Sequence, residues 1–317
     1  MNVPPVLSVV VPVFNERENL DALLTRLLPV LEQTGEPFDV VFVDDGSRDG
    51  SAEMLDAFHA RDARVKVVHL SRNFGHQAAL QAGLDHARGD AVVMMDADLQ
   101  DPPELLGQFV AAWRGGHDVV YAVRKKRREH ALKRFAYAAF YRTIKVMAEI
   151  DVPLDAGDFC LLDRRVVDTL VALPEHNRFL RGLRSWVGFR QTGVEYERAA
   201  RHAGAPKYTL RKLVRLALSG YVGFSSMPLR AAAWAGLTAA VVGFTIALWV
   251  VYTKLVDIPS PRGWASLMAV MLVVAGVQLL VLGVLGEYLG RVYEEVRRRP
   301  LYIARSRVGF ADEEDHR

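Results

Sequence analysis

The strongest chemical motif in this sequence is an acidic string, DADLQDPPE, at residues 96–104. It directly follows an apolar run at residues 91–95, whose composition is typical of a buried strand. In an extended segment alternate side chains share one side, so Asp96 and Asp98 are expected next to each other. Carboxylate oxygens suit magnesium or manganese (Mg²⁺ or Mn²⁺), and such an ion stabilises a diphosphate leaving group. The alternative is a loop whose acids cap the helix that begins near Pro102.

The elements that must position this motif alternate between two periodicities. Apolar, strand-like runs lie at residues 6–13, 38–43, 65–70 and 91–95, and segments with helical spacing lie at 18–31, 52–60 and 76–87. Strands that alternate with helices predict a largely parallel sheet with helices on both faces. Ligands bind such sheets at the carboxyl ends of the strands. Polar residues gather at those ends: Asn15 and Glu16, Asp44 and Asp45, Ser71 to Asn73, and the acidic string.

Two long stretches, residues 231–253 and 263–286, contain no charged residue. About 20 apolar residues suffice for a helix to cross a bilayer, so these stretches predict a transmembrane hairpin in preference to buried core helices. The connecting loop carries only two basic residues, Lys254 and Arg262, whereas six arginines follow the hairpin. The positive-inside rule then places both ends in the cytoplasm, as in a multi-pass protein of the cell membrane.

Further basic residues are mixed with apolar residues in the segments 130–150 and 207–230. Both segments suit the surface of a membrane, and packed amphipathic helices with solvated charges are the alternative. The formal net charge of +3 is too small for a nucleic-acid footprint, so no nucleic-acid partner is expected. The single cysteine, Cys160, excludes an internal disulfide.

Four segments in order resemble the inverting glycosyltransferases with a GT-A fold: PVFNE at residues 12–16, VDDGS at 43–47, NFG at 73–75 and the acidic string. Over nearly the whole chain the sequence is similar to polyprenyl-phosphate glycosyltransferases, a class that includes bactoprenol glucosyltransferases, undecaprenyl-phosphate aminoarabinose transferase and dolichyl-phosphate mannose synthase. The resemblance implies a GT-A (Rossmann-like) mixed sheet domain. It also implies transfer of a sugar, with inversion, from a nucleotide-sugar donor (a UDP-sugar is favoured over a GDP-sugar) to a polyprenyl-phosphate lipid acceptor.

The same resemblance assigns a donor site position by position. Nucleotide-sugar contacts are expected at Pro12, Phe14, Glu16, Val43, Asp45, Asp96, Ala97, Arg124, Arg201 and Lys207, and metal ligands at Asp98, Gln100 and Asp96. Guanidinium groups are good bidentate phosphate ligands, which agrees with the arginine assignments. The alternatives are a solvated basic face at residues 124–128 and, for the later residues, contact with anionic lipid. Asp44 and Asp45 also suit an Asx-type turn before Gly46, and a turn and a ligand contact can coexist.

The segment DAGDFCLLD at residues 155–163 resembles a Gly-Asp-Phe-Arg-Leu segment of the same family, in which the Asp lies beside the acceptor. Here Cys160 replaces the arginine. Asp158 and Asp98 are the expected catalytic residues. A polyprenyl phosphate is already anionic near neutral pH, so Asp158 is either a general base or an orienting group, and a helix N-cap is the alternative. The acceptor phosphate is expected at Arg134, Arg178 and Arg181. Three histidines without metal-ligand spacing are interpreted as ordinary surface or loop residues: His59, His69 and His76.

The predicted organisation has four parts. They are a GT-A catalytic domain at residues 1–206, a juxtamembrane amphipathic segment at 207–230, a transmembrane hairpin at 231–290 and a basic cytoplasmic tail at 291–317. The resemblance also implies that homo-oligomers such as tetramers can form. Two other functions stay open. A processive polysaccharide synthase normally has more membrane helices and a Gln-x-x-Arg-Trp signal; a non-catalytic sugar-nucleotide or lipid-binding scaffold is disfavoured by the intact pair Asp96 and Asp98.

Overall fold

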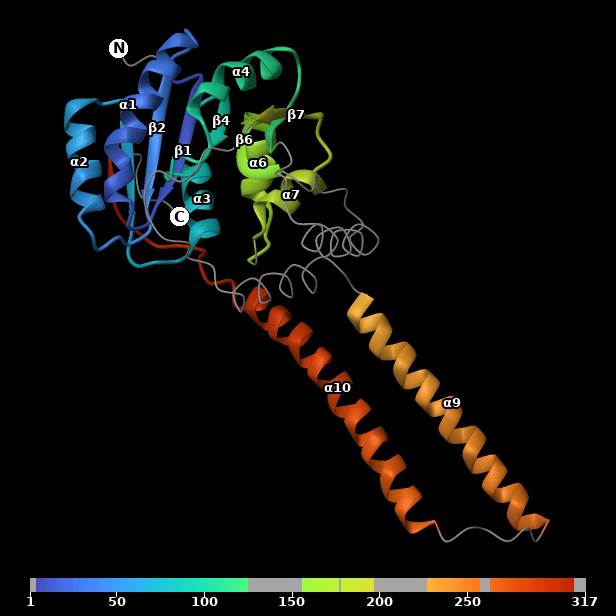
Figure 1. Cartoon of the computed structure of the whole chain (residues 1–317). Helices are drawn as coiled ribbons and strands as arrows, with labels where there is room; N and C mark the ends of the chain where they lie inside the picture. The colour runs from blue at the N-terminus through green and yellow to red at the C-terminus, as the bar shows by residue number, and fades with distance from the viewer. Residues whose placement is uncertain (1–3, 125–155, 177, 197–226, 257–262, 311–317) are drawn as a thin grey trace. The chain divides into compact units, whose positions relative to one another are not determined.

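The computed structural model describes residues 4–124, 156–176, 178–196, 227–256 and 263–310 (Figure 1). The chain divides into two compact units. The first, here called the sheet unit, comprises Met1–Lys145, Ile150–Tyr208 and Pro300–Arg317; the second, the hairpin unit, comprises Val146–Glu149 and Thr209–Arg299. In the sequence, therefore, most of the hairpin unit is inserted between two parts of the sheet unit.

One mixed sheet of eight strands forms the sheet unit, in the order β7-β5-β6-β4-β1-β2-β3-β8. Its parallel centre consists of β1 (Leu7–Val13), β2 (Phe38–Asp44), β3 (Val65–Leu70) and β4 (Ala91–Met94). On one side β6 (Ala156–Asp163) runs antiparallel to β4 and to β5 (Val119–Arg124), and β7 (Gln191–Tyr196) pairs in parallel with β5. The predicted strand–helix alternation is confirmed, and β6 makes the sheet mixed.

The helices of the sheet unit follow the apolar periodicity of the sequence. They are α1 (Arg17–Gln33), α2 (Ser51–Arg61), α3 (His76–His86), the 3-10 turn η1 (Pro103–Leu105), α4 (Leu106–Arg114), α6 (Arg164–Ala172) and α7 (Leu180–Trp186). In α1, leucines three or four positions apart share one face of the helix and are fully buried. The α6 N-cap, Asp163, accepts a hydrogen bond from the Arg165 backbone N–H at 3.1 Å.

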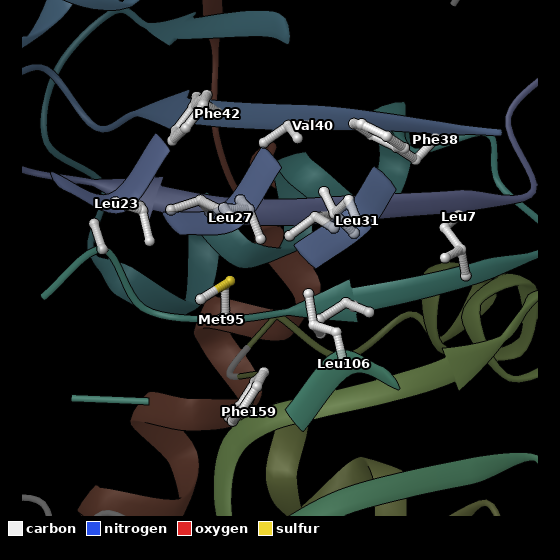
Figure 2. Close-up of a cluster of buried hydrophobic side chains, with 14 of the residues drawn as sticks. Leu7, Leu23, Leu27, Leu31, Phe38, Val40, Phe42, Met95, Leu106 and Phe159 are labelled. Atoms are coloured by element: carbon white, nitrogen blue, oxygen red, sulfur yellow. The ribbon is translucent and has the colours of Figure 1, made fainter. Parts of the chain in front are cut away.

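Side chains on the two faces of the sheet form two hydrophobic clusters. Successive residues of a strand point to opposite faces, so Val9 and Val11 join one cluster and Val10 joins the other. Figure 2 shows the first cluster, in which Leu23 and Leu27 of α1 lie near labelled side chains of the sheet. Burial of this kind stabilises a fold by about 25 cal/mol per Å² of apolar surface. The packed layers hold the strand ends, and therefore the loops between them, in fixed positions.

The segment after the hairpin unit differs from the expected cytoplasmic tail at residues 291–317. Its first part continues α10 (Trp264–Arg297), and Ala304–Val308 forms β8, antiparallel to β3 at the edge of the sheet. The Tyr302 hydroxyl donates to Asp85 Oδ2 of α3 at 2.8 Å, and the Ser71 backbone N–H donates to the Ile303 carbonyl at 2.9 Å. An open strand edge offers unpaired backbone groups, and β8 satisfies those of β3.

The described part of the hairpin unit consists of two long apolar helices, α9 (Met227–Leu255) and α10. Windows of mean hydropathy 1.7 at Ala232–Trp249 and 1.8 at Val273–Arg297 are long enough to cross a membrane. Only 6% of the first window and 0% of the second are buried, which argues against the buried-core alternative for these described residues. Exposed apolar surface of this extent is typical of a membrane or protein interaction site.

Candidate active site

The loops after β1 and β2 are joined at the carboxyl ends of these neighbouring strands. The Asn15 backbone N–H donates to Ser47 Oγ at 3.0 Å, and the Arg48 N–H donates back to Asn15 Oδ1 at 2.8 Å. A third bond, 2.8 Å long, runs from the Asp45 N–H to the Val13 carbonyl. Asn15 has φ 54°, a left-handed conformation that asparagine tolerates better than most residues. The two loops therefore form one braced surface.

Four predicted nucleotide contacts lie on or near this surface. Pro12 and Val43 are register partners on β1 and β2, and both are buried. Phe14 directly follows β1 and is 38% exposed, so its ring is available to a ligand. The Glu16 carboxylate accepts a hydrogen bond from Asn19 Nδ2 at 2.6 Å in the first turn of α1. The structure brings these residues to one edge of the sheet, and their contacts with a nucleotide stay predictions.

Asp45 braces the next loop along the sheet. Its carboxylate accepts hydrogen bonds from the backbone N–H groups of Phe74 at 2.7 Å and Gly75 at 3.0 Å. Burial raises the pKa of Asp45, although these two bonds lower it in part. Beside it Gly46 has φ +70°, and a Cβ there would lie 2.8 Å from the Arg72 carbonyl carbon. Only glycine fits this close approach of two loops.

The turn at Asp44 is of the predicted Asx type, and its contact with His69 shows that the predicted surface or loop position of this histidine is wrong. Asp44 Oδ1 accepts the Ser47 N–H at 2.9 Å, which closes the turn. His69 is buried on β3, with Nδ1 3.2 Å from Asp44 Oδ2 and Nε2 2.9 Å from Asp56 Oδ1. The hydrogen bond with Asp44 is the main reason that the pKa of His69 is raised. His69 is therefore a buried structural residue that holds β2, whereas the sequence predicted a surface or loop position.

The acidic string after β4 forms a compact turn, which differs from the predicted extended segment. Leu99 has φ 58°, and the Gln100 backbone N–H donates to Asp98 Oδ1 at 3.1 Å. Asp98 is only 7% exposed. Asp101, also buried, accepts the Tyr196 hydroxyl hydrogen bond at 2.5 Å, which ties the string to β7. The carboxylates are therefore placed near the strand ends by a local turn of the backbone, and not by the alternation of side chains along an extended strand.

His76 joins the carboxylates of two distant segments, and sequence reasoning missed it. Its Nε2 lies 3.6 Å from Asp96 Oδ1 and 3.6 Å from Asp158 Oδ2. His76 is the first residue of α3, directly after Gly75. The available signal was its position after the NFG segment, one of the four motifs that carry the resemblance. The structure thus brings Asp96 and Asp158 to one site, with an imidazole between them.

The charges around Asp158 keep it ionised. Burial raises its pKa, but the interaction with His76 and the positive charges of Arg181 and Arg184 outweigh burial and lower the pKa to about 2. Arg181 Nε and Nη2 both lie 3.3 Å from Asp158 Oδ1. Burial opposes protonation of His76, yet Asp158 and Asp96 raise the pKa of this imidazole overall. The site therefore holds alternating negative and positive groups.

Asp96 is surrounded by more negative than positive groups, a property expected of a site that binds a cation. Burial is the main cause that raises its pKa to about 6, and His76 opposes the rise. Neighbouring carboxylates add to the rise: Asp101, Asp158 and Asp98. Within the described residues no group of three or more His, Cys, Asp or Glu side chains is arranged to hold a metal. The donor set instead fits a hard divalent cation held by one or two carboxylates and by substrate phosphates.

The predicted phosphate-binding residues other than Arg178 divide into three groups. Arg181 lies at the site beside Asp158. Arg124 ends β5, opposite Tyr196 of β7 in the strand register. Three other predicted phosphate ligands lie outside the described residues: Arg134, Arg201 and Lys207.

Arg178, predicted at the acceptor phosphate, makes its described contacts near the end of α6. Its Nη1 donates to Gln81 Oε1 and to the Leu170 carbonyl, both at 2.7 Å. Its other nitrogens donate to backbone carbonyls at the end of α6 and just after it, those of Val171, Leu173 and Glu175. These contacts use the five N–H donors of the guanidinium. Arg178 therefore fixes the end of α6, and its contact with the acceptor phosphate stays a prediction.

Two known families match the sequence. The family "Glycosyl transferase family 2" matches residues 8–171, and the family "GtrB C-terminal hairpin" matches residues 227–292. The mixed sheet, the acidic strand-end site and these matches define a glycosyltransferase with a C-terminal hairpin. The chain belongs to glycosyl transferase family 2.

Similar proteins show which glycosyltransferases this chain resembles. "Uncharacterized glycosyltransferase YkcC" of Bacillus subtilis (strain 168) is 47% identical over 98% of this chain and 96% of its own length. "Bactoprenol glucosyl transferase" of Shigella phage SfII is 41% identical over 94% of this chain and 96% of its own length. The predicted resemblance to bactoprenol glucosyltransferases is therefore confirmed. Among solved structures, glucosyl-3-phosphoglycerate synthase from Mycobacterium tuberculosis in complex with phosphoglyceric acid aligns with a TM-score of 0.46 and 19% identity, over 70% of this chain and 80% of the other.

Proposed function

We propose that this glycosyltransferase moves a hexose from a nucleotide-diphosphate-sugar, with UDP as the favoured nucleotide, to a polyprenyl phosphate with inversion at the anomeric carbon. The observation that carries the proposal is the combination, in one chain, of the strand-end site with a GtrB-type hairpin, as in relatives named bactoprenol glucosyl transferase. An isoprenoid tail stays in the bilayer because its transfer to water costs about 0.8 kcal/mol per CH₂. A membrane hairpin therefore keeps the enzyme where its acceptor is.

The acceptor phosphate oxygen attacks C1 of the sugar from the side opposite the diphosphate. The new C1–O bond forms as the C1–O bond to the diphosphate breaks, and that electron pair leaves with the nucleotide. Phosphate monoesters lose their second proton near pH 6, so the nucleophile is already anionic. Asp158, with a pKa of about 2, is a poor proton acceptor at neutral pH. Its pairing with Arg181 supports an orienting role: it aims a guanidinium at the acceptor phosphate.

The donor diphosphate is expected at the acidic turn. Asp98 and Gln100, with Asp96 beside them, would hold a magnesium or manganese ion, which when bound supplies charge stabilisation for the departing diphosphate. The raised pKa of Asp96 supports this position, because a cation there offsets the local excess of carboxylates. Further phosphate contacts are proposed at Arg124, Arg134, Arg201 and Lys207. Positioning and charge stabilisation then supply most of the catalysis.

We place the sheet unit and both ends of the hairpin in the cytoplasm. Strand β8 follows the hairpin in sequence yet pairs with β3, so residues before and after the hairpin belong to one sheet. A hairpin whose two ends lead into one folded unit crosses the bilayer twice and returns to the same side. Arg297, Arg298 and Arg299 after α10 support the cytoplasmic side under the positive-inside rule.

The decisive experiment uses the full chain in lipid nanodiscs with a panel of nucleotide-sugars. Nucleotide release is measured with and without polyprenyl phosphate, and the lipid product is isolated for anomeric analysis. The expected result is turnover that depends on the acceptor, with one donor strongly preferred and the product inverted. Polymer formation would indicate a processive synthase, and binding of nucleotide-sugar without turnover for any donor would indicate a scaffold. Either outcome refutes the proposed function.

A further inference from the structure

A buried arginine, Arg184 of α7, lies beneath the active site and is 1% exposed. Its Nη1 donates to the Gly157 carbonyl at 3.4 Å, and its guanidinium carbon lies 5.0 Å from the centre of the Tyr121 ring. Its Nε and Nη2 are buried and have no hydrogen-bond partner among the described residues. Within the described part of the chain, the Arg184 guanidinium therefore has one long hydrogen bond to oxygen, with the Cys160 thiol as its other polar neighbour.

A buried charged group of this kind lowers the free energy of unfolding. Burial of a charge without full hydrogen bonding is strongly unfavourable, and an apolar side chain of similar volume often serves a core as well or better. Buried unsatisfied polar groups are rare, and each one calls for an explanation. Packing alone does not explain Arg184, because a methionine would fill the same space without the penalty. A benefit in function is the remaining explanation.

The surroundings of Arg184 indicate that benefit. Gly157, whose carbonyl it holds, directly precedes Asp158 on β6. Cys160 is fully buried in the cluster that also contains Leu183 of α7, and its thiol lies within the influence of the Arg184 charge. Residues 158 and 160 share one face of β6, since alternate residues of a strand do so. Arg184 is therefore next to the backbone and the face of β6 that present Asp158.

We propose that Arg184 is a positioning residue for the transfer reaction: from inside the protein it fixes the start of β6 and holds the Asp158 carboxylate in place between His76 and Arg181. The inference rests on the proposed function, because Asp158 matters only if the site catalyses this transfer. Without the buried charge, Asp158 forms a stronger ion pair with Arg181, and the Arg181 guanidinium then turns away from the acceptor phosphate. Arg184 touches no substrate and acts through Asp158.

The test compares wild type, Arg184→Met and Arg178→Met as full chains in nanodiscs. Arg184→Met keeps the volume and removes the charge. We expect its kcat to fall about 10- to 100-fold, the range seen when a partner of a functional ligand is lost, with KM for the nucleotide-sugar changed less than about twofold. Its unfolding midpoint is expected to change little, because the gain from removing a buried charge is offset by the electrostatic support that Asp158 loses. Arg178→Met is the contrasting control and is expected to lower the midpoint, because carbonyls near the end of α6 lose their donors.

A rescue variant makes the test independent of packing. Because the Cys160 thiol lies near the Arg184 charge, Cys160→Arg in the Arg184→Met background returns a guanidinium to the same region from β6. We expect this double variant to regain most of the lost kcat. Wild-type kcat in Arg184→Met overturns the inference, and so does a lowered unfolding midpoint with no rescue, the result of a purely structural role. A wild type without acceptor-dependent transfer refutes the proposed function, and the inference falls with it.

Discussion

Replacement of Asp158 by asparagine tests the charge balance of the site, because it removes the carboxylate charge and keeps the shape. The pKa of Asp158 lies at about 2, against an ordinary value of 3.8. At about 1.4 kcal/mol for each pKa unit, the folded state favours the carboxylate by about 2 kcal/mol. The side chain is 18% exposed, so solvent screens this value only in part. Asp158→Asn is expected to lower the free energy of unfolding by about that amount near pH 6.

The sign of the pH dependence follows from the lowered pKa. A carboxyl group whose pKa is lower in the folded state stabilises the protein above its unfolded-state pKa, here 3.8. This stabilisation is lost as the pH falls towards 2, so the difference between wild type and variant is expected to shrink over this interval. Above the pKa of His76 the difference also decreases, since a neutral imidazole no longer supports the carboxylate.

The assay is denaturant unfolding of both full chains in nanodiscs with a metal chelator, followed by tryptophan fluorescence from pH 3 to pH 8. Asp168→Asn is the matched control, because its side chain is 65% exposed and its ion pair with Arg164 is 3.6 Å long. Exposed pairs contribute about 0–1 kcal/mol, so little change is expected there. Equal stability of wild type and Asp158→Asn near pH 6, or a difference that grows as the pH falls, refutes the reasoning.

The same variant separates the two roles left open for Asp158. A group with a pKa of about 2 contributes no limb to a rate profile between pH 5 and pH 8. If Asp158 orients Arg181, kcat falls in Asp158→Asn and the profile keeps its shape. Loss of an acidic limb in the variant would identify a general base and contradict the orienting role.

Three further predictions concern neighbouring residues. Asp98→Ala is expected to abolish metal-dependent transfer with the unfolding midpoint retained; wild-type-like turnover, or unchanged manganese binding in calorimetry, would disprove the metal assignment. His76→Gln removes the imidazole between two carboxylates and is expected to lower kcat/KM about tenfold, the equivalent of one charge-assisted contact. The free energy of unfolding is expected to change by less than about 1 kcal/mol, because the ring is 42% exposed. An unchanged kcat/KM would show that His76 has no role in the reaction. Tyr196→Phe removes the buried hydrogen bond to Asp101 and is expected to lower the free energy of unfolding by about 1–3 kcal/mol; chemical denaturation that gives the wild-type value would show that this bond is not needed.

Local patterns were sufficient for much of the fold. The strand-like runs, the helical spacing of leucines in α1 and the uncharged stretches of α9 and α10 depend on the polarity of nearby residues, which the sequence displays directly. Strand β8 was missed for the same reason. Its five residues, ARSRV, carry two arginines and no long apolar run. They form a strand because the edge of β3 supplies hydrogen-bond partners from far away in the sequence.

The candidate site shows the same division. The acidic string and the Asp158 segment were identified from their residues, whereas the positions of His76 and Arg184 came from contacts between segments 20 or more positions apart along the chain, such as the 27 positions between Arg184 and Gly157. A one-dimensional pattern does not say which of two nearby arginines contacts a carboxylate, as Arg181 does, and which contacts the end of a helix, as Arg178 does.

By itself the sequence determined the alternation of strands and helices, the apolar hairpin and the acidic groups that can attract a cation, since each depends on residue type and short-range spacing. The tertiary structure decided the charge state of those groups. Burial and neighbouring charges hold the pKa of Asp158 at about 2 and that of Asp96 at about 6, although both begin as the same side chain. Electrostatic interactions depend on distance and solvent access in three dimensions, and these are set only when the strands are brought together.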